Sequence, residues 1–325
     1  MQQTSRYLPL VLSLAVVPAL QAFTPKNGVT STTEISVLGQ TINAYYASDS
    51  GFVYGSGNTL FAQPFAGGSP TNLGTVPTPQ DSFSAIIQRS NGDVVYADGS
   101  FTAPFIHDLG VLSGGNFNEL STFNGVYDFA HNPVTGGLFF SANDGTGSSI
   151  YGFNYATGSV TEYIEVLGNS AGLAFDAAGN LFFGSDPDDA IYTVNASLLN
   201  SAPGTPLTSA DSGISAFITS VNASFLTVGD DGTVVVSANR ADFSGTDLLL
   251  YNDDGTWRGK AGNTSGFSSY LGEVYWEDDS VYVSETDFFS FSNVLEVGNL
   301  SGVPEPAAFP AVGALLALLA LRRRR

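Results

Sequence analysis

Six short apolar segments recur along the chain between Thr30 and Ser301, and each has similar surroundings. A turn leads into a core of three apolar residues, and small and acidic residues follow. The copies read SGFVYGSG, GDVVYADG, GGLFFSAND, GNLFFGSD, GTVVVSAN and DSVYVSET, with cores that begin at Phe52, Val94, Leu138, Leu181, Val234 and Val281. The successive spacings are therefore 42, 44, 43, 53 and 47 residues. A period in the forties built from short β-segments is typical of propeller blades.

Each copy has one strand-like segment before it and another after it. The preceding segments are INAYY, SFSAIIQ, VYDFAHN, GLAFDA, SFLTVG and GEVYWED, and the following ones are TLFAQPF, FTAPFIHDL, SIYGFNY, AIYTVN, DLLLYND and NVLEVGN. Aromatic and β-branched residues, which favour strands, are frequent in both sets. Turn residues such as Ser90-Asn91-Gly92-Asp93 separate the first two segments and suit tight hairpins.

A fourth, outer strand is predicted in five repeats, as PTNLGTV, NFNELST, SVTEYIEVL, GTPLTSA and TWRGKAG. The sixth repeat lacks one, because the chain runs from Leu300 directly into its C-terminal segment. The unassigned segment 33–38, TEISVL, can supply the missing strand and close the ring. The sequence therefore predicts an all-β, six-bladed β-propeller of four-stranded antiparallel blades, and this closure favours six blades over seven.

One repeat also resembles a known type of propeller. Residues 172–184, Gly-Leu-Ala-Phe-Asp-Ala-Ala-Gly-Asn-Leu-Phe-Phe-Gly, are similar to the repeat of NHL and YncE-type propellers. The resemblance covers this blade well and the other blades loosely. It implies the fold and no particular activity.

The first 22 residues are typical of a secretory signal peptide. Arg6 precedes an apolar run from Leu8 to Leu20, and Ala22 suits the last position before cleavage. The alternative is a buried helix of the mature fold, which Pro9 and Pro18 disfavour. We expect recognition by the Sec translocon and signal peptidase, and a propeller domain over residues 23–302.

Residues 303–325 form a tail of three parts. The motif Pro304-Glu305-Pro306 precedes an apolar stretch, Ala307 to Leu321, which precedes Arg322, Arg323, Arg324 and Arg325. The stretch is short for a transmembrane helix, which usually needs about 17–25 residues, although flanking arginines can snorkel. By the positive-inside rule the arginines stay in the cytoplasm and the body lies outside.

This tail resembles the PEP-CTERM sorting signal of Gram-negative bacteria. The resemblance implies that Pro304, Glu305 and Pro306 are recognised by an exosortase, a membrane protease that removes the tail. It implies a cell-surface or extracellular protein, transiently anchored in the inner membrane and associated with exopolysaccharide and biofilm. The alternative is a plain tail anchor.

The composition excludes several kinds of function. The chain has 10 basic and 30 acidic residues, a formal charge of −20, and such a field repels nucleic acid. It has no cysteine, so disulfides and thiolate sites are absent. The two histidines, His107 and His131, are expected to lie far apart, and no phosphate loop, Gly-x-Ser-x-Gly elbow or His-Glu-x-x-His motif occurs. No catalytic or cofactor-binding residue is therefore assigned.

Oxygen-bearing side chains recur near the ends of the second strands. Asp98, Asn143, Asp186, Asn239 and Glu285 would approach one rim of the ring, and Asp188 and Asp189 extend the run after Asp186. A ring of oxygen ligands suits Ca²⁺. The alternative is turn capping, which Asp and Asn commonly provide at strand ends.

Three functions remain open at this stage. The sequence favours a non-enzymatic surface or matrix protein that uses a propeller face to bind polysaccharide or another protein. The second hypothesis is a Ca²⁺-dependent propeller hydrolase, similar to lactonases. The third is a degenerate propeller that serves only as a spacer.

Overall fold

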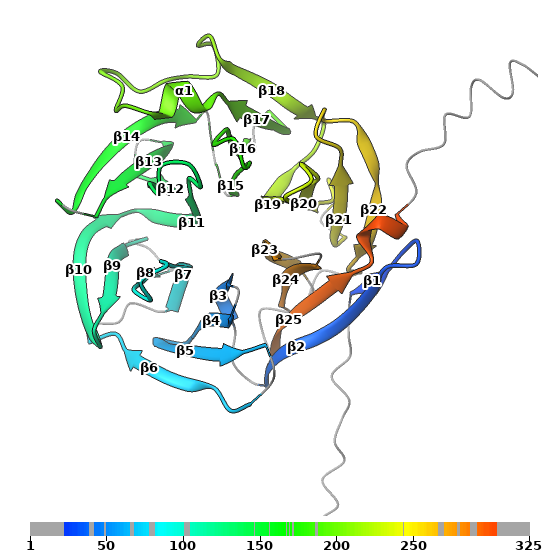
Figure 1. Ribbon diagram of the computed structural model, residues 1–325, viewed down its shortest axis with the longest axis horizontal. Helices are drawn as coiled ribbons and strands as arrows, with labels where there is room; N and C mark the ends of the chain where they lie inside the picture. The colour runs from blue at the N-terminus through cyan, green and yellow to red at the C-terminus, as the bar shows by residue number, and fades with distance from the viewer. Residues whose placement is uncertain are drawn as a thin grey trace, which may run out of the picture.

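The protein folds as a ring of six antiparallel β-sheets around a central axis (Figure 1). The computed structural model describes residues 23–303 except 39–41, 49, 66–67, 78–81, 101–104, 146, 156, 167, 169, 171, 186–187, 243, 266–269, 278–279 and 287–290. The sheets follow one another along the chain and are numbered here as blades 1 to 6. The prediction of a six-bladed all-β propeller with four-stranded blades is confirmed.

The first three blades each consist of four consecutive strands. Blade 1 contains β3 (Ile42–Ser48), β4 (Gly51–Ser56), β5 (Thr59–Pro64) and β6 (Thr71–Thr75). Blade 2 contains β7 (Ser82–Gln88), β8 (Val94–Gly99), β9 (His107–Ser113) and β10 (Asn116–Phe123). Blade 3 contains β11 (Gly125–His131), β12 (Leu138–Asn143), β13 (Ser148–Asn154) and β14 (Ser159–Val166).

The remaining blades depart from this pattern in small ways. Blade 4 contains β15 (Leu173–Phe175), β16 (Leu181–Ser185), β17 (Ala190–Val194) and β18 (Ile214–Thr219), with helix α1 (Ala196–Leu199) between the last two strands. Blade 5 contains β19 (Ala223–Val228), β20 (Val234–Asn239), β21 (Thr246–Tyr251) and β22 (Trp257–Asn263). Blade 6 contains β23 (Tyr270–Glu277), β24 (Ser280–Thr286) and β25 (Phe291–Gly298), followed by the 3₁₀ turn η1 (Leu300–Gly302).

The N-terminal strand β2 (Thr30–Leu38) completes blade 6 by pairing with β25. The register runs from Thr30 opposite Gly298 to Leu38 opposite Phe291. Ile35 of β2 is buried against residues of blades 1 and 6, among them Tyr45 and Val294. The predicted closure of the ring by the N-terminal strand is therefore confirmed.

The structure adds a strand that the sequence did not reveal. β1 (Thr24–Pro25) pairs with β22 and makes blade 5 five-stranded. Phe23, just before β1, is buried and packs on Gly262, where any side chain would collide with the phenyl ring of Phe23. The N-terminal segment therefore joins the outer edges of two neighbouring blades (Figure 1).

Two predicted strands are wrong in position. The outer strand of blade 4 is Ile214–Thr219 rather than 204–210, because Ile214 and Ile218 are buried there. Within 204–210, Leu207 instead makes an isolated bridge to Ile164 of blade 3. The third strand of blade 2 is His107–Ser113 rather than 101–109, so it begins six residues later and ends four residues later than predicted, because Leu109 and Leu112 are buried there.

The apolar triplets form the second strand of each blade. β4 and β8 are buried along their whole length, because both faces of a blade pack against neighbouring blades. The inner strands β3, β7, β11, β19 and β23 share an irregularity near their start, where the register shifts against the second strand. Such bulges redirect side chains and often lie beside functional sites.

The predicted signal peptide, residues 1–22, and the predicted tail, residues 303–325 with its apolar transmembrane stretch, lie outside the described residues except for Val303. Within the described part of the chain, no helix is long and apolar enough to cross a membrane.

Closure by β2 predicts that Ile35→Ala lowers the free energy of unfolding by about 2–5 kcal/mol, because it leaves a cavity between blades. The neighbouring Ser36→Ala, on an exposed side chain, should change it by less than about 0.5 kcal/mol. Denaturant unfolding of the full chain measures both. Equal effects of the two substitutions would mean that β2 contributes little to closing the ring.

Candidate functional site

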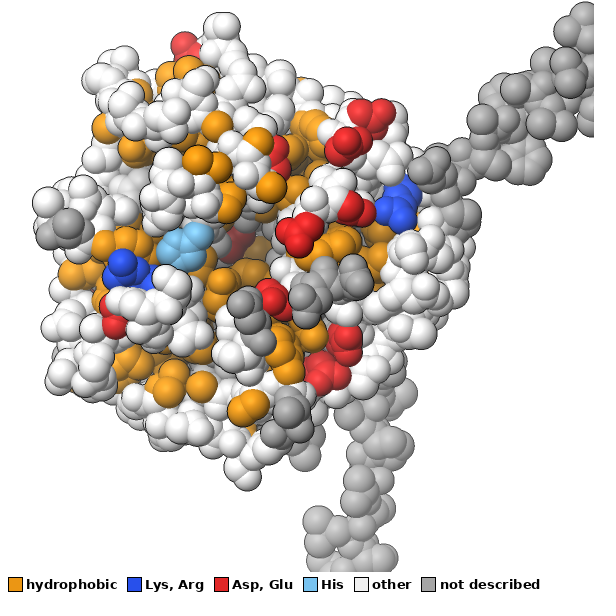
Figure 2. Space-filling view, in the orientation of Figure 1, with side chains coloured by type: hydrophobic (Ala, Val, Ile, Leu, Met, Phe, Trp, Pro, Cys, Tyr) orange, Lys and Arg blue, Asp and Glu red, His pale blue; other side chains and the backbone are white. Residues whose placement is uncertain are grey.

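A cavity of about 210 Å³ lies on the axis of the ring and is lined by all six inner strands. Tyr46, Ile87, Asp128, Leu173, Thr227 and Tyr275 each represent one of these strands in its wall. The cavity is bordered by residues at the C-terminal ends of the inner strands, where hairpin turns lead to the second strands. Figure 2 shows a hollow at the centre of one face of the ring, with a histidine side chain beside it and a basic side chain next to that.

Asp128 is the buried carboxyl group of this cavity. Asp128 is the first paired residue after the β-bulge of β11. The first paired residue after the corresponding bulge is Ala44 in blade 1, Ala85 in blade 2 and Phe225 in blade 5. Its Oδ1 accepts the N–H of Phe129 (2.8 Å) and its Oδ2 accepts the N–H of Leu173 in blade 4 (2.8 Å). Burial raises the pKa of Asp128 to about 8, although both hydrogen bonds oppose the shift.

Glu273 in blade 6 makes a similar connection to the next blade. Its Oε2 accepts the N–H of Tyr45 in blade 1 (2.7 Å), and the Tyr45 hydroxyl donates to the carbonyl groups of Glu273 (3.0 Å) and Tyr282 (2.6 Å). Burial, and then the charge of Asp128, raise the pKa of Glu273 above its ordinary value. Its Oε1 is buried without a hydrogen-bond partner among the described residues. Both carboxyl groups therefore hold neighbouring blades together.

Tyr275 in blade 6 lines the cavity and reaches blades 1 and 2. Its ring contacts Tyr45 and Tyr46 edge-on at centroid distances of 5.1 Å and 5.3 Å. Its hydroxyl donates to the carbonyl oxygen of Ile86 in blade 2 at 3.4 Å. Burial and the charges of Glu273 and Asp128 raise its pKa, so the phenol stays neutral.

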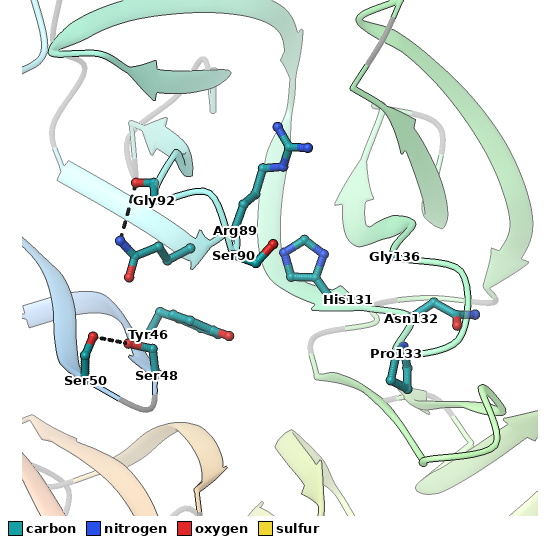
Figure 3. A pocket seen from close by; sticks show the side chains of 11 residues that line it. Tyr46, Ser48, Ser50, Arg89, Ser90, Gly92, His131, Asn132, Pro133 and Gly136 are labelled. Carbon is teal, nitrogen blue, oxygen red and sulfur yellow. Dashed lines mark hydrogen bonds between the residues drawn. The ribbon is translucent and has the colours of Figure 1, made fainter.

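A larger groove of about 660 Å³ adjoins the axial cavity on the same face. The hairpin turns of blades 1, 2 and 3 form it, with Tyr46 and His131 belonging to both hollows. Figure 3 shows the Ser90 hydroxyl next to the imidazole of His131. Burial, and then the charge of Arg89, lower the pKa of His131 to about 4. The Nε2 of this neutral imidazole has no hydrogen-bond partner among the described residues.

The oxygen ligands expected from the sequence lie near the opposite ends of the blades, where the second strands finish. Asp98 and Glu285 are buried, and Glu285 accepts a hydrogen bond from Asn293 (3.2 Å). Asn239 donates to Ser224 (2.7 Å), and Asn143 accepts the N–H of Gly145 (2.7 Å). The bond to Asn143 caps a turn, whereas those of Asn239 and Glu285 join side chains of paired strands.

The run after the second strand of blade 4 is only partly described. Asp188 and Asp189 are exposed, and Asp188 accepts hydrogen bonds from Ser185 (3.0 Å) and Tyr192 (3.1 Å). Asp186, Pro304, Glu305, Pro306 and Arg322 to Arg325 lie outside the described residues. Within the part of the chain that the structure covers, no three His, Asp or Glu side chains lie close enough to share a metal ion. The calcium site itself stays a prediction.

The comparisons with known proteins identify the fold. No family model matches the chain, and no curated protein matches its sequence. Solved structures do match. A luciferin-regenerating enzyme has a TM-score of 0.60 at 12% identity, over 86% of this chain and 97% of its own. A gluconolactonase from Xanthomonas campestris scores 0.56 at 12% identity, over 88% and 94%. Regucalcin, a calcium-binding protein from Agrobacterium tumefaciens, scores 0.55 at 15% identity, over 82% and 93%.

These neighbours agree with the resemblance of the body to NHL and YncE-type propellers. They correct the preferred function. The sequence favoured a non-enzymatic surface or matrix protein, whereas two of these neighbours are enzymes and the third binds calcium, which favours the hydrolase alternative. Identities of 12–15% establish the fold alone, so the activity must be argued from the site.

The buried carboxyl groups predict that the protein loses stability as the pH rises. The native pKa of Asp128, about 8, lies above its ordinary value of 3.8, so its contribution is complete below about pH 4 and is lost as the pH rises through 8. Glu273 acts in the same direction. Denaturant unfolding between pH 5 and 9 should show a fall that is shallower in Asp128→Asn.

The control is Asp230→Asn, which neutralises an exposed carboxylate and should keep the wild-type slope. The same slope in wild type and Asp128→Asn would show that Asp128 ionises normally in the folded protein.

Proposed function

We propose that the protein hydrolyses small cyclic esters, and that the reaction takes place in the axial cavity with Asp128 as the general base. One observation carries this proposal: a single buried carboxyl group with a pKa near 8 lies in the wall of a cavity large enough for a small ring. A base is most effective when its pKa lies near the working pH. Ordinary carboxylates are weaker bases by about four pKa units.

The proposed reaction adds one water to the ester bond. Ionised Asp128 takes a proton from the water as the water oxygen bonds to the carbonyl carbon. The electron pair of the carbonyl double bond moves onto the carbonyl oxygen. The tetrahedral intermediate then collapses, the bond to the ring oxygen breaks, and Asp128 returns the proton to that oxygen. The product is an open hydroxy acid, which ionises at neutral pH.

Other residues of the cavity can assist this reaction. Thr227 accepts the N–H of Trp276 at Oγ1 (3.2 Å), which leaves its hydroxyl proton to donate to the developing oxyanion. The backbone N–H groups of Phe129 and Leu173 fix the orientation of the Asp128 carboxyl group. Neutral His131 borders the mouth of the cavity.

The proposal includes no step through a metal ion. The described residues do not offer a calcium donor set. Both oxygens of Asp128 accept backbone N–H groups, and no three acidic or imidazole side chains among these residues lie close enough to hold a metal ion. The names of the neighbouring structures, a gluconolactonase among them, support lactone hydrolysis as the first activity to assay.

Loss of the base predicts that Asp128→Asn lowers kcat/KM for lactones by about 10²–10⁴-fold. Wild-type kcat/KM should rise with pH and level off above about pH 8, as Asp128 ionises. Titration of released acid measures the rate on five- and six-membered lactones, γ-butyrolactone and δ-gluconolactone among them.

The matched control is Glu273→Gln, because Glu273 also bonds the next blade but is not in the wall of the cavity. It should keep activity within a few-fold. Similar losses in both variants would indicate a structural role for Asp128, and an inactive wild type on every lactone would overturn the proposal.

We also propose that both chain ends are sorting segments, as their residues suggest. Phe23, which follows the first segment, and Val303, which precedes the Pro-Glu-Pro motif, are buried in one cluster with residues of blades 5 and 6. This supports a domain that begins after Ala22 and ends before Pro304. The exported protein would then reach the cell surface through signal peptidase and an exosortase-like protease.

Processing at these boundaries predicts a mature N-terminus at Phe23 and loss of the segment from the sorting motif onward. Intact-mass measurement of the protein from an exosortase-bearing host checks both. A mature chain that keeps Arg322 to Arg325 would contradict the sorting proposal.

A further inference from the structure

Arg89 is one of the residues that line the groove beside the axial cavity. It follows β7 and begins the hairpin turn of blade 2. Its guanidinium carbon lies 3.6 Å from the ring centroid of Tyr155 in blade 3, which is stacking distance for a cation on an aromatic face. His131 lies on the same side, with its ring 6.3 Å from that of Tyr155. The three side chains form one cluster across two blades.

The Arg89 guanidinium is held in place, but most of its N–H groups form no hydrogen bond among the described residues. Its only hydrogen bond among the described residues runs from Nη1 to Asp93 Oδ2, a long contact of 3.4 Å. Asp93 is shared with other donors, since hydrogen bonds from Ser113 and Asn91 lower its pKa more than Arg89 does. The Arg89 side chain is 31% exposed. A planar guanidinium with unused N–H groups is suited to bind a carboxylate through two parallel bonds.

The rest of the groove suits a polar ligand. Ser48, Ser50, Gln88, Ser90 and Asn132 contribute hydroxyl and amide groups to its lining. His131 also borders the groove, with its unpartnered Nε2 buried. The chain carries a formal charge of −20, so a cation within a hollow of its surface is unusual. A polyhydroxylated anion matches these groups.

We propose that this groove binds the carboxylate of a hydroxy acid through Arg89, and that this hydroxy acid is the product released from the axial cavity. The inference rests on the proposed hydrolysis, which converts an uncharged ring into an anion. Tyr46 and His131 border both hollows, so the groove lies directly beside the cavity from which the product leaves. Arg89 distinguishes product from substrate because only the product carries a full negative charge.

Binding can be measured without turnover, by calorimetry with D-gluconate and with D-glucitol, its uncharged counterpart. Wild type should bind gluconate at least tenfold more tightly than glucitol. Arg89→Gln should lose that preference. Arg89→Lys should keep part of it, because lysine retains the positive charge but cannot form the two parallel hydrogen bonds to a carboxylate. Tyr155→Leu should weaken binding by removing the aromatic surface, whereas Tyr155→Phe should not.

The control is Lys26→Gln, which removes one positive charge from an exposed side chain beyond β1 and should bind gluconate as wild type does. Equal binding of gluconate and glucitol, an unaltered preference in Arg89→Gln, or equally tight binding of sulfate would each overturn the proposal of a carboxylate site.

Kinetics separate this inference from the proposed activity. If lactones are hydrolysed, gluconate should inhibit wild type and should inhibit Arg89→Gln at least tenfold less. If no lactone is hydrolysed but Arg89-dependent gluconate binding persists, the hydrolase proposal fails while the carboxylate site stands. If hydrolysis occurs without such inhibition, the groove does not bind the product.

Discussion

The structure depends on the closure of its ring. Each blade buries both faces against its neighbours, so a blade at an open end would expose one apolar face and one unpaired edge. Strand β2 prevents this by pairing with β25 along its whole length. β1 adds a second attachment on blade 5, with Phe23 packed over Gly262. The axial cavity exists because the six inner strands are held at fixed positions around it.

Among the described residues of the inner strands, Asp128 and Glu273 are the buried carboxyl groups. Asp128 and Glu273 occupy positions where other blades place Ala44, Ala85 or Phe225. Burial of a carboxyl group is costly unless it is hydrogen-bonded or protonated. Both groups bond a backbone N–H of the next blade, which offsets part of that cost. Asp128 alone lies in the cavity wall, and this difference between two similar residues is the reason to assign it chemistry.

The fold was largely predictable because it is repetitive. Triplets such as Leu181-Phe182-Phe183 mark the second strand of each blade. The N-terminal segment was the one predicted strand without a blade, and the sixth blade lacked one strand. The outer strand of blade 4 was misplaced because helix α1 and the Leu207 bridge lengthen that repeat, which the 53-residue spacing already indicated. β1 was missed because two residues carry no periodic signal.

The candidate site was not predictable in the same way. The sequence drew attention to the ends of the second strands, where Asp and Asn are frequent, whereas the cavity lies at the C-terminal ends of the inner strands. His131 was dismissed because the other histidine is distant, although its partners are Arg89 and Tyr155. An acidic residue within an apolar inner strand, as in Val126-Tyr127-Asp128-Phe129-Ala130, was the available signal. Its meaning depended on burial, which only the assembled ring reveals.

The most direct test of this account is a crystal structure of Asp128→Asn with a lactone that the wild-type protein hydrolyses slowly enough to be trapped in the variant. The account predicts the ring in the axial cavity, with its carbonyl carbon facing residue 128 and its polar groups toward His131. A lactone bound instead at the opposite face, against Asp98, Asn143, Asn239 and Glu285, would contradict it and would return attention to the calcium site expected there.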